Sequence, residues 1–352
     1  MNVFFKSTLA IILFILLGIA GYILKHALYE RYVWPSEIPS VQDLPPEDKS
    51  KWRKTPIKWQ EETVDIEVAT PQGLKVTPIH YYTNSIGMDF VYIKSATYIQ
   101  NANWVSSSQA KKNLRRRHQW FDKGRKITIT KPFYISAFEV TNAEYELFDP
   151  THKAKRPKYQ EGIVGDLHPV EPVTWQQAQY YARWLSEKEG RQYRIPTMGE
   201  WLLAAKAGTS TRTYWGESWW DRSKANLGGL HSVAETYKTD LFKETAPVGY
   251  YPANPWGLYD MLGNSYEWTN DWWHPFELKD VIDPKGPKTG KLRLAMGGSW
   301  TTRNYAIYSS EKDGNNPADL RDFRGIRLVV DVAVNMISKE QDVQSNKVEN
   351  HF

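Results

Sequence analysis

The pattern of apolar and polar positions predicts short strands and a few helices. Between Lys126 and Phe138, apolar residues recur at every second position, which indicates a pair of β-strands interrupted by Pro132. Three helices follow, at 142–148, 175–190 and 198–207, each preceded by a threonine with glutamate or glutamine three residues later, which is the signature of a capping box. Strands together with well-capped helices predict an α+β domain.

The N-terminal part of the chain has a different pattern. Residues 1–7 are a short tail, and residues 8–24 form an apolar run flanked by Lys6 and Lys25, which predicts a segment that enters a membrane. Small residues at 18–20 would also suit a signal peptidase, so a cleaved signal peptide stays open. Apolar character continuing to Leu24 favours an uncleaved signal anchor. We expect a single-pass protein of a bacterial inner membrane, with its globular domain on the periplasmic side.

The apolar run is followed by three further regions. Residues 25–83 contain many prolines and mixed charges, which predicts an extended spacer. The globular domain is expected at 84–332. The polar tail at 333–352 lacks periodicity and is predicted to be disordered.

The composition limits which fold types, which chemical reactions and which partners are possible. A chain of 352 residues with 41% hydrophobic residues can bury one large core. Its 16 Trp and 21 Tyr, combined with 22 Gly and 20 Pro, indicate a loop-rich fold held by aromatic packing. The absence of cysteine excludes disulfides and thiol chemistry. The net charge of +5 is modest and no nucleic-acid-binding motif is found, so we expect no nucleic acid partner.

One aromatic stretch, residues 254–273, is neither a helix face nor a strand. Its glycines and asparagines permit positive φ, so we expect a rigid, irregular segment that crosses the core. Such a segment leaves buried carbonyls without a ladder, and a hard cation that prefers oxygen ligands could satisfy several of them. Asp260 and Glu267 would supply charge, and Gly263 would let the chain turn between them. The alternative is that Asp260 caps a turn and Glu267 pairs with an arginine.

A basic loop lies between residues 100 and 125. It contains Arg115, Arg116 and Arg117 in succession. The loop is either a solvated surface segment or a contact for phospholipid headgroups or an acidic partner.

A series of short motifs in a fixed order is more specific than any of these patterns. The motifs are Glu139-Val140-Thr141, His168-Pro169-Val170, Val173-Thr174-Trp175, Tyr193-Arg194-Ile195-Pro196-Thr197, Glu200-Trp201, Tyr214-Trp215-Gly216, Ala225-Asn226, Pro247-Val248-Gly249, Asn254-Pro255-Trp256-Gly257-Leu258-Tyr259-Asp260-Met261, Gly263-Asn264, Glu267-Trp268-Thr269, Gly297-Gly298-Ser299-Trp300 and Arg324-Gly325-Ile326-Arg327. The chain resembles the formylglycine-generating (sulfatase-modifying factor) family, whose fold is a variant of the C-type lectin fold. The resemblance covers roughly residues 84–331.

The resemblance implies two structural calcium ions. One set of ligands comprises Asn226, the Leu227 carbonyl, Asp240 and the Phe242 carbonyl. The other comprises Asp260, the Gly263 and Ser265 carbonyls, and Glu267, in the segment already described. Oxygen ligands suit calcium, and the role would be structural. Capping and ion pairing remain the alternative for these side chains.

The catalytic half of the family pattern is missing. Formylglycine-forming members bind copper through two cysteines shortly after the Gly-Gly-Ser motif, and Thr302 and about Ile307 stand at those places, after Ser299. A hydroxyl and an aliphatic chain do not bind Cu(I), so we expect no copper and no formylglycine-forming activity. The vacated catalytic positions are therefore Ser299, Thr302 and Ile307.

Two functions are compatible with this pattern. The first is a membrane-anchored, non-catalytic binding or scaffold protein that acts on an exported or envelope protein or peptide, with Trp215, Trp219 and Trp220 as candidate contacts, because Trp is favoured in interfaces. Trp272 and Trp273 could supply further anchors. The alternative for all of these tryptophans is packing in the core. The second is a cysteine-independent tailoring enzyme for a secreted peptide or metabolite, with Glu311 or Asp313 as general base.

Overall fold

The computed structural model describes the domain and not the N-terminal run. The described residues are 59–101, 124–159, 162–163, 165–217, 221, 223–227, 242, 244–275, 277, 279–302, 312–321 and 323–332. Within these ranges, no helix is both long and apolar enough to cross a membrane. The predicted anchor at 8–24 and the predicted disordered tail at 333–352 lie outside the described residues.

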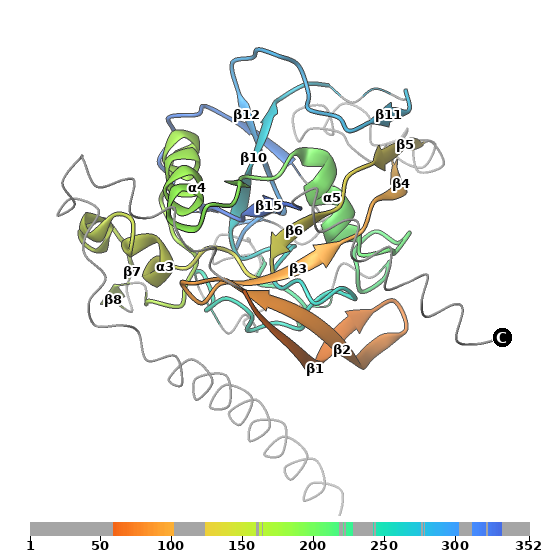
Figure 1. Ribbon diagram of the computed structural model, residues 1–352, viewed down its shortest axis with the longest axis horizontal. Helices are drawn as coiled ribbons and strands as arrows, with labels where there is room; N and C mark the ends of the chain where they lie inside the picture. The colour runs from red at the N-terminus through yellow and green to blue at the C-terminus, as the bar shows by residue number, and fades with distance from the viewer. Residues whose placement is uncertain are drawn as a thin grey trace, which may run out of the picture. The chain divides into compact units, whose positions relative to one another are not determined.

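The largest sheet is antiparallel, and its central strands come from both ends of the domain. Its strand order is β1-β2-β3-β6-β15-β9. These strands are Gln60–Thr70, Gly73–Thr83, Asp89–Ile93, Phe133–Ser136, Val329–Asp331 and Tyr193–Arg194. Because β15 lies between β6 and β9, the end of the domain is held inside the sheet, as Figure 1 shows.

A second sheet carries the segment that includes the aromatic stretch. Its order is β13-β12-β10-β14, with bounds Lys312–Asn315, Arg293–Met296, Tyr266–Trp272 and Arg324–Gly325. A third sheet, β11-β5-β4, joins Val281–Ile282, Gly124–Ile129 and Ala96–Asn101, and a two-stranded ribbon joins β7 (Lys158–Tyr159) to β8 (Gly162–Ile163). The two strands predicted around Pro132 exist as β5 and β6. They do not pair with each other, however, because they belong to different sheets.

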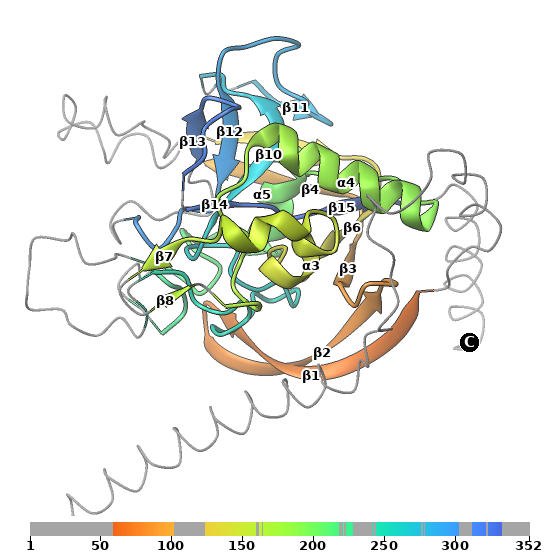
Figure 2. The same cartoon turned by 90° about the vertical axis from the view of Figure 1, so that its left-hand side faces the viewer.

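The helices confirm the capping signals in the sequence. Helices α3 (Asn142–Glu146), α4 (Trp175–Glu189) and α5 (Met198–Lys206) each begin with a complete capping box. A 3-10 helix, η4 (Pro150–Ala154), follows α3. Helix α5 packs against β5 and β10, and Figure 2 shows α3 and α4 running across the sheets. The predicted α+β class with short sheets and few helices is therefore confirmed.

Two apolar clusters form the core, one on each face of the large sheet. Ile135 belongs to the cluster around α5 and Trp201, whereas its neighbour Tyr134 belongs to the cluster around α4 and Phe90. Alternate residues of a strand point to opposite faces, so β6 contributes to both clusters. This arrangement places α5 and the start of β10 together in the interior.

The predicted spacer at 25–83 is wrong for its last part. Residues 60–83 form β1 and β2, and β2 continues the main sheet by pairing with β3. The charged residues of β1 are exposed while Val68 is buried, so the strand alternates as an edge strand should. Proline and charge density obscured this alternation. The domain therefore begins at or before Trp59 rather than at residue 84.

Trp59 fixes the start of the domain. Its ring stacks on Phe90 at 5.1 Å and meets Tyr134 edge-on at 5.1 Å. Its indole N–H donates to Glu189 at 3.2 Å, and the same carboxylate accepts the hydroxyl of Tyr193. The side chain is buried, so it contributes both packing and a hydrogen bond.

Replacing Trp59 by alanine should lower the free energy of unfolding by about 3–5 kcal/mol, because loss of a buried indole leaves a cavity and removes one of the donors to Glu189. Urea denaturation of the whole chain measures this. Tyr180→Ala, which alters an exposed residue of α4, should change the free energy by less than about 0.5 kcal/mol. Equal losses in the two variants would show that Trp59 is not an anchor.

Candidate functional site

The aromatic stretch is an irregular segment that its own side chains hold in place. The Asn254 amide oxygen accepts from the backbone N–H groups of Trp256 (3.0 Å) and Leu258 (3.2 Å), while its amide nitrogen donates to the carbonyl of Ala204. Positive φ angles occur at Asp260, Gly263 and several neighbours. A Cβ on Gly263 would lie 2.4 Å from the carbonyl oxygen of Asn226, so only glycine fits there.

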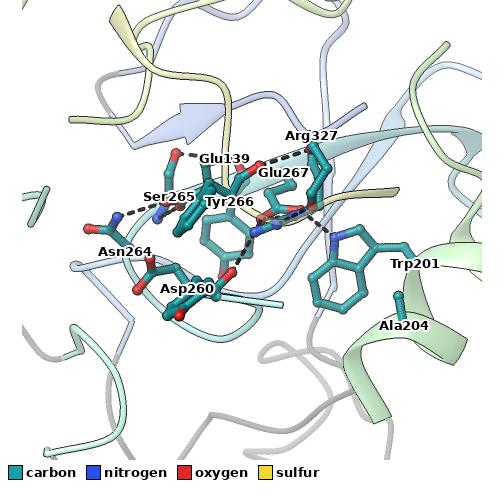
Figure 3. A network of polar contacts seen from close by, with 12 residues as sticks. Glu139, Trp201, Ala204, Asp260, Asn264, Ser265, Tyr266, Glu267 and Arg327 are labelled. Atoms are coloured by element: carbon teal, nitrogen blue, oxygen red, sulfur yellow. Dashed lines mark hydrogen bonds and ion pairs between the residues drawn. The ribbon is translucent and has the colours of Figure 1, made fainter. Parts of the chain in front are cut away.

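A fully buried ion pair lies at the centre of this segment. The Arg327 guanidinium donates to both carboxylate oxygens of Glu267 at 2.7–2.9 Å. It also donates to the carbonyls of Ser136 and Tyr259, at 2.8 Å each. The indole N–H of Trp201 donates to Glu267 at 2.5 Å, as Figure 3 shows. Arg327 thus satisfies a carboxylate and two irregular carbonyls at once.

Two more buried carboxylates, Glu139 and Asp260, lie near this pair. Glu139 accepts from the Asn264 amide at 2.8 Å and from the backbone N–H of Ser265 at 3.0 Å. Burial, followed by the nearby charges of Asp260 and Glu267, raises the pKa of Glu139 well above its usual range. Burial lowers the pKa of Arg327, but Glu267, Glu139 and Asp260 together outweigh this effect, so the net pKa is raised. Three carboxylates therefore surround one cation.

The first predicted calcium set is only partly described. Asn226 is buried, and its amide nitrogen donates to the carbonyl of Glu244 at 2.7 Å and to Asn264 at 3.1 Å. Leu227 is buried in the core, and the Phe242 ring meets Tyr250 edge-on at 4.7 Å. Asp240, which would carry the charge of this set, lies outside the described residues.

In the second predicted calcium set, the carbonyl oxygens accept no hydrogen bond from a described residue, whereas both carboxylates accept hydrogen bonds. Within the described residues, no hydrogen bond reaches the carbonyl oxygens of Gly263 or Ser265. The backbone N–H of Gly249 donates to Asp260 at 2.5 Å, and Glu267 is bonded to Arg327 and Trp201. No group of three or more acidic or histidine side chains in the described ranges is arranged to share an ion. The surplus of buried negative charge and the free carbonyls fit a divalent cation held chiefly by backbone oxygens.

The vacated catalytic positions are filled by hydroxyl groups that bond to one another. The Thr302 hydroxyl accepts from the backbone N–H of Ser299 at 2.9 Å and lies 3.4 Å from the phenol oxygen of Tyr266. The Ser299 hydroxyl lies 2.8 Å from that of Thr301. Ser299, Thr302 and Tyr266 are buried. Ile307 lies outside the described residues.

Of the predicted partner contacts Trp215, Trp219, Trp220 and Arg115 to Arg117, the structure describes only Trp215. Trp215 is buried against Tyr214, with ring centroids 4.7 Å apart, so it is a core residue and its assignment as a surface contact is wrong. The alternative of core packing is therefore correct for Trp215. Trp219, Trp220, Arg115, Arg116 and Arg117 lie outside the described residues.

Sequence reasoning missed two functional parts of the buried centre. Glu139 and Arg327 each occur in a quoted motif, but nothing in their spacing shows that they approach the segment around Glu267. The alternative in which Glu267 pairs with an arginine is confirmed, and the partner is Arg327.

Comparisons with known proteins agree with this geometry. A family model described as the sulfatase-modifying factor enzyme 1-like domain matches residues 93–332. The formylglycine-generating enzyme of Mus musculus is 33% identical over 260 residues, which are 59% of this chain and 68% of that protein. The serine/threonine-protein kinase pkn1 of Chlamydia caviae is 29% identical over 218 residues, 55% of this chain but only 32% of the kinase.

A solved structure extends the agreement to the fold. PvdO from Pseudomonas aeruginosa superposes with a TM-score of 0.56 at 23% identity, covering 72% of this chain and 98% of that one. The fold and the buried centre thus define a sulfatase-modifying-factor-like protein. The chain belongs to the family of the sulfatase-modifying factor enzyme 1-like domain.

Removing the central cation should destabilise the domain strongly. Arg327→Met leaves Glu267 buried without its cation and two carbonyls without a donor, so we expect a loss of about 3–5 kcal/mol in the free energy of unfolding. Chemical denaturation compares it with Arg321→Met, whose arginine is exposed and should cost less than about 1 kcal/mol. A loss below that of Arg321→Met would contradict the central role of Arg327.

Proposed function

We propose that this chain is a non-catalytic member of its family that binds a polypeptide partner. The observation that carries the proposal is the hydroxyl cluster of Ser299, Thr301, Thr302 and Tyr266. Its polar groups are bonded to one another, where copper-dependent members need soft sulfur ligands. Ser299, Thr302 and Tyr266 are buried while Thr301 is exposed, and hydroxyl groups that bond to one another supply no soft ligand for copper.

Catalysis by a carboxylate has less support. Asp313 lies 3.7 Å from the buried guanidinium of Arg324, which gives this side chain a structural partner. Glu311 lies outside the described residues. The cysteine-independent tailoring activity therefore has no observation in its favour, whereas the binding role explains why a complete core surrounds a filled catalytic position.

The activity assay tests the first half of this proposal. The purified chain, incubated with copper, oxygen and a reductant, should leave a cysteine-containing peptide unchanged in mass, because it has no thiolate to hold Cu(I). The formylglycine-generating enzyme of Mus musculus serves as the positive control. Appearance of the aldehyde product with this chain would refute the non-catalytic role.

We also propose a structural calcium ion at Asp260, the Gly263 and Ser265 carbonyls, and Glu267. The free carbonyls and the surplus of carboxylates over guanidinium support it. The ion would neutralise Asp260 and Glu139 and bind carbonyls that Arg327 does not reach. Its role would be to hold the irregular segment rather than to take part in a reaction.

Calcium should therefore stabilise the chain. At a calcium concentration of about a hundred times Kd, the free energy of unfolding should rise by about 2.7 kcal/mol over its value in chelator. Asp260→Asn should reduce this rise, while Asp313→Asn, which alters a more exposed carboxylate, should leave it unchanged. Metal analysis after dialysis gives the bound amount. If the protein retains no calcium and unfolds identically in chelator and in calcium, the site does not exist.

A further inference from the structure

Three consecutive side chains at the end of β10 are each matched by a glycine from another segment. A Cβ on Gly286 would lie 3.2 Å from the carboxylate of Asp271, and one on Gly290 would lie 2.8 Å from Trp272. A Cβ on Gly314 would lie 2.6 Å from the Trp273 ring. The two indoles therefore lie against backbone that only glycine can provide, which fixes their orientation. Trp273 remains 37% exposed.

Trp272, the residue before Trp273, is held in a stack with an arginine and a second tryptophan. The Arg293 guanidinium lies 3.6 Å from the centroid of the Trp272 ring and 3.8 Å from that of Trp175. It donates to the Asn270 carbonyl at 2.7 Å. This sandwich holds Trp175 at the start of α4 and Trp272 at the end of β10 as one rigid unit. The end of β10, from which Trp273 follows, is thus held rigidly.

The segment between β11 and β12 adds positive charge beside this surface. It carries Lys285, Lys288 and Lys291, all exposed, and it rises above the sheet at the top of Figure 1. Leu292, 38% exposed, lies next to Trp273, because its carbonyl accepts the backbone N–H of Trp273 at 2.7 Å. We call Trp273, Leu292 and the three lysines the Trp273 surface.

The lysines of the Trp273 surface have no acidic partner within the described residues, while the nearby carboxylates are already bonded. Asp283 accepts from the backbone N–H of Thr130 at 2.8 Å and from its hydroxyl at 2.5 Å. Asp271 accepts from the backbone N–H of Met198 at 2.7 Å. Residues 283–292 carry three lysines and one aspartate, so the segment is net positive, which favours a partner of opposite sign.

We propose that the Trp273 surface binds an acidic polypeptide segment carrying an apolar side chain. The lysines would face its carboxylates, and Trp273 with Leu292 would pack against its apolar side chain, because an aromatic anchor ringed by polar groups is typical of interface hot spots. The Trp273 ring packs against Gly314 of β13, and its exposed part is free to contact an apolar side chain of the partner. The proposal rests on the binding role and names the partner class.

Fluorescence anisotropy of the whole chain tests this with a labelled synthetic peptide of glutamate and leucine. We expect saturable binding that weakens as salt rises, and no binding of the matched glutamine–leucine peptide. Lys285→Gln, Lys288→Gln and Lys291→Gln together should weaken binding about tenfold. Trp273→Ala should weaken it by about thirtyfold or more.

A charge-matched control replaces Lys75, Lys94 and Lys153, which are exposed on other elements, by glutamine. Equal weakening by this control would overturn the proposal, since net charge alone would then explain binding. Binding to anionic phospholipid vesicles that depends on the three lysines, without peptide binding, would overturn it as well. The readout is binding and not turnover, so formylglycine formation would refute the non-catalytic role without touching this result.

Discussion

The contact on which the rest of the domain depends is the buried pair of Arg327 and Glu267. Arg327 enters just before β15, and Glu267 lies at the start of β10, so the pair joins the two main sheets at the centre of the protein. An isolated buried charge is costly, and here each charge is accompanied by additional hydrogen bonds from Trp201, Ser136 and Tyr259. The pair thereby gives an irregular segment a single arrangement, which a purely apolar core would not specify.

The irregular segment crosses the domain interior without regular secondary structure. Residues 254–265 cross the interior without a ladder, and side chains such as Asn254 and Asn264 bond to several backbone groups in and around them, although no described residue donates to the Gly263 and Ser265 carbonyls. Burial, followed by the charges of Asp260 and Glu267, raises the pKa of Glu139. Arg327 and the proposed calcium ion would each neutralise part of the buried carboxylate charge.

The residues after the Gly-Gly-Ser motif place hydroxyl groups inside the family fold. Small hydroxyl side chains fill the space around Ser299 and bond to one another and to Tyr266, so their burial costs little. At the surface, glycines allow aromatic side chains to pack directly against the backbone. Gly290 and Gly314 admit indole rings against the backbone, and with Arg293 they make a rigid aromatic face next to a lysine-bearing loop. Core and surface are thus specified by separate sets of residues.

The sequence by itself determined the local elements and the family. The threonine capping boxes set the starts of α3, α4 and α5, because a cap depends on residues within one turn, and the ordered motifs identified the fold. Only the tertiary structure decided that β5 and β6 lie in different sheets, that residues 60–83 extend the main sheet, and that Trp215 is buried while Trp273 is exposed. The tertiary structure also determines that the arginine paired with Glu267 is Arg327. These outcomes depend on contacts between residues far apart in the chain, and neither spacing nor composition encodes which of several compatible partners a strand or a charge will meet.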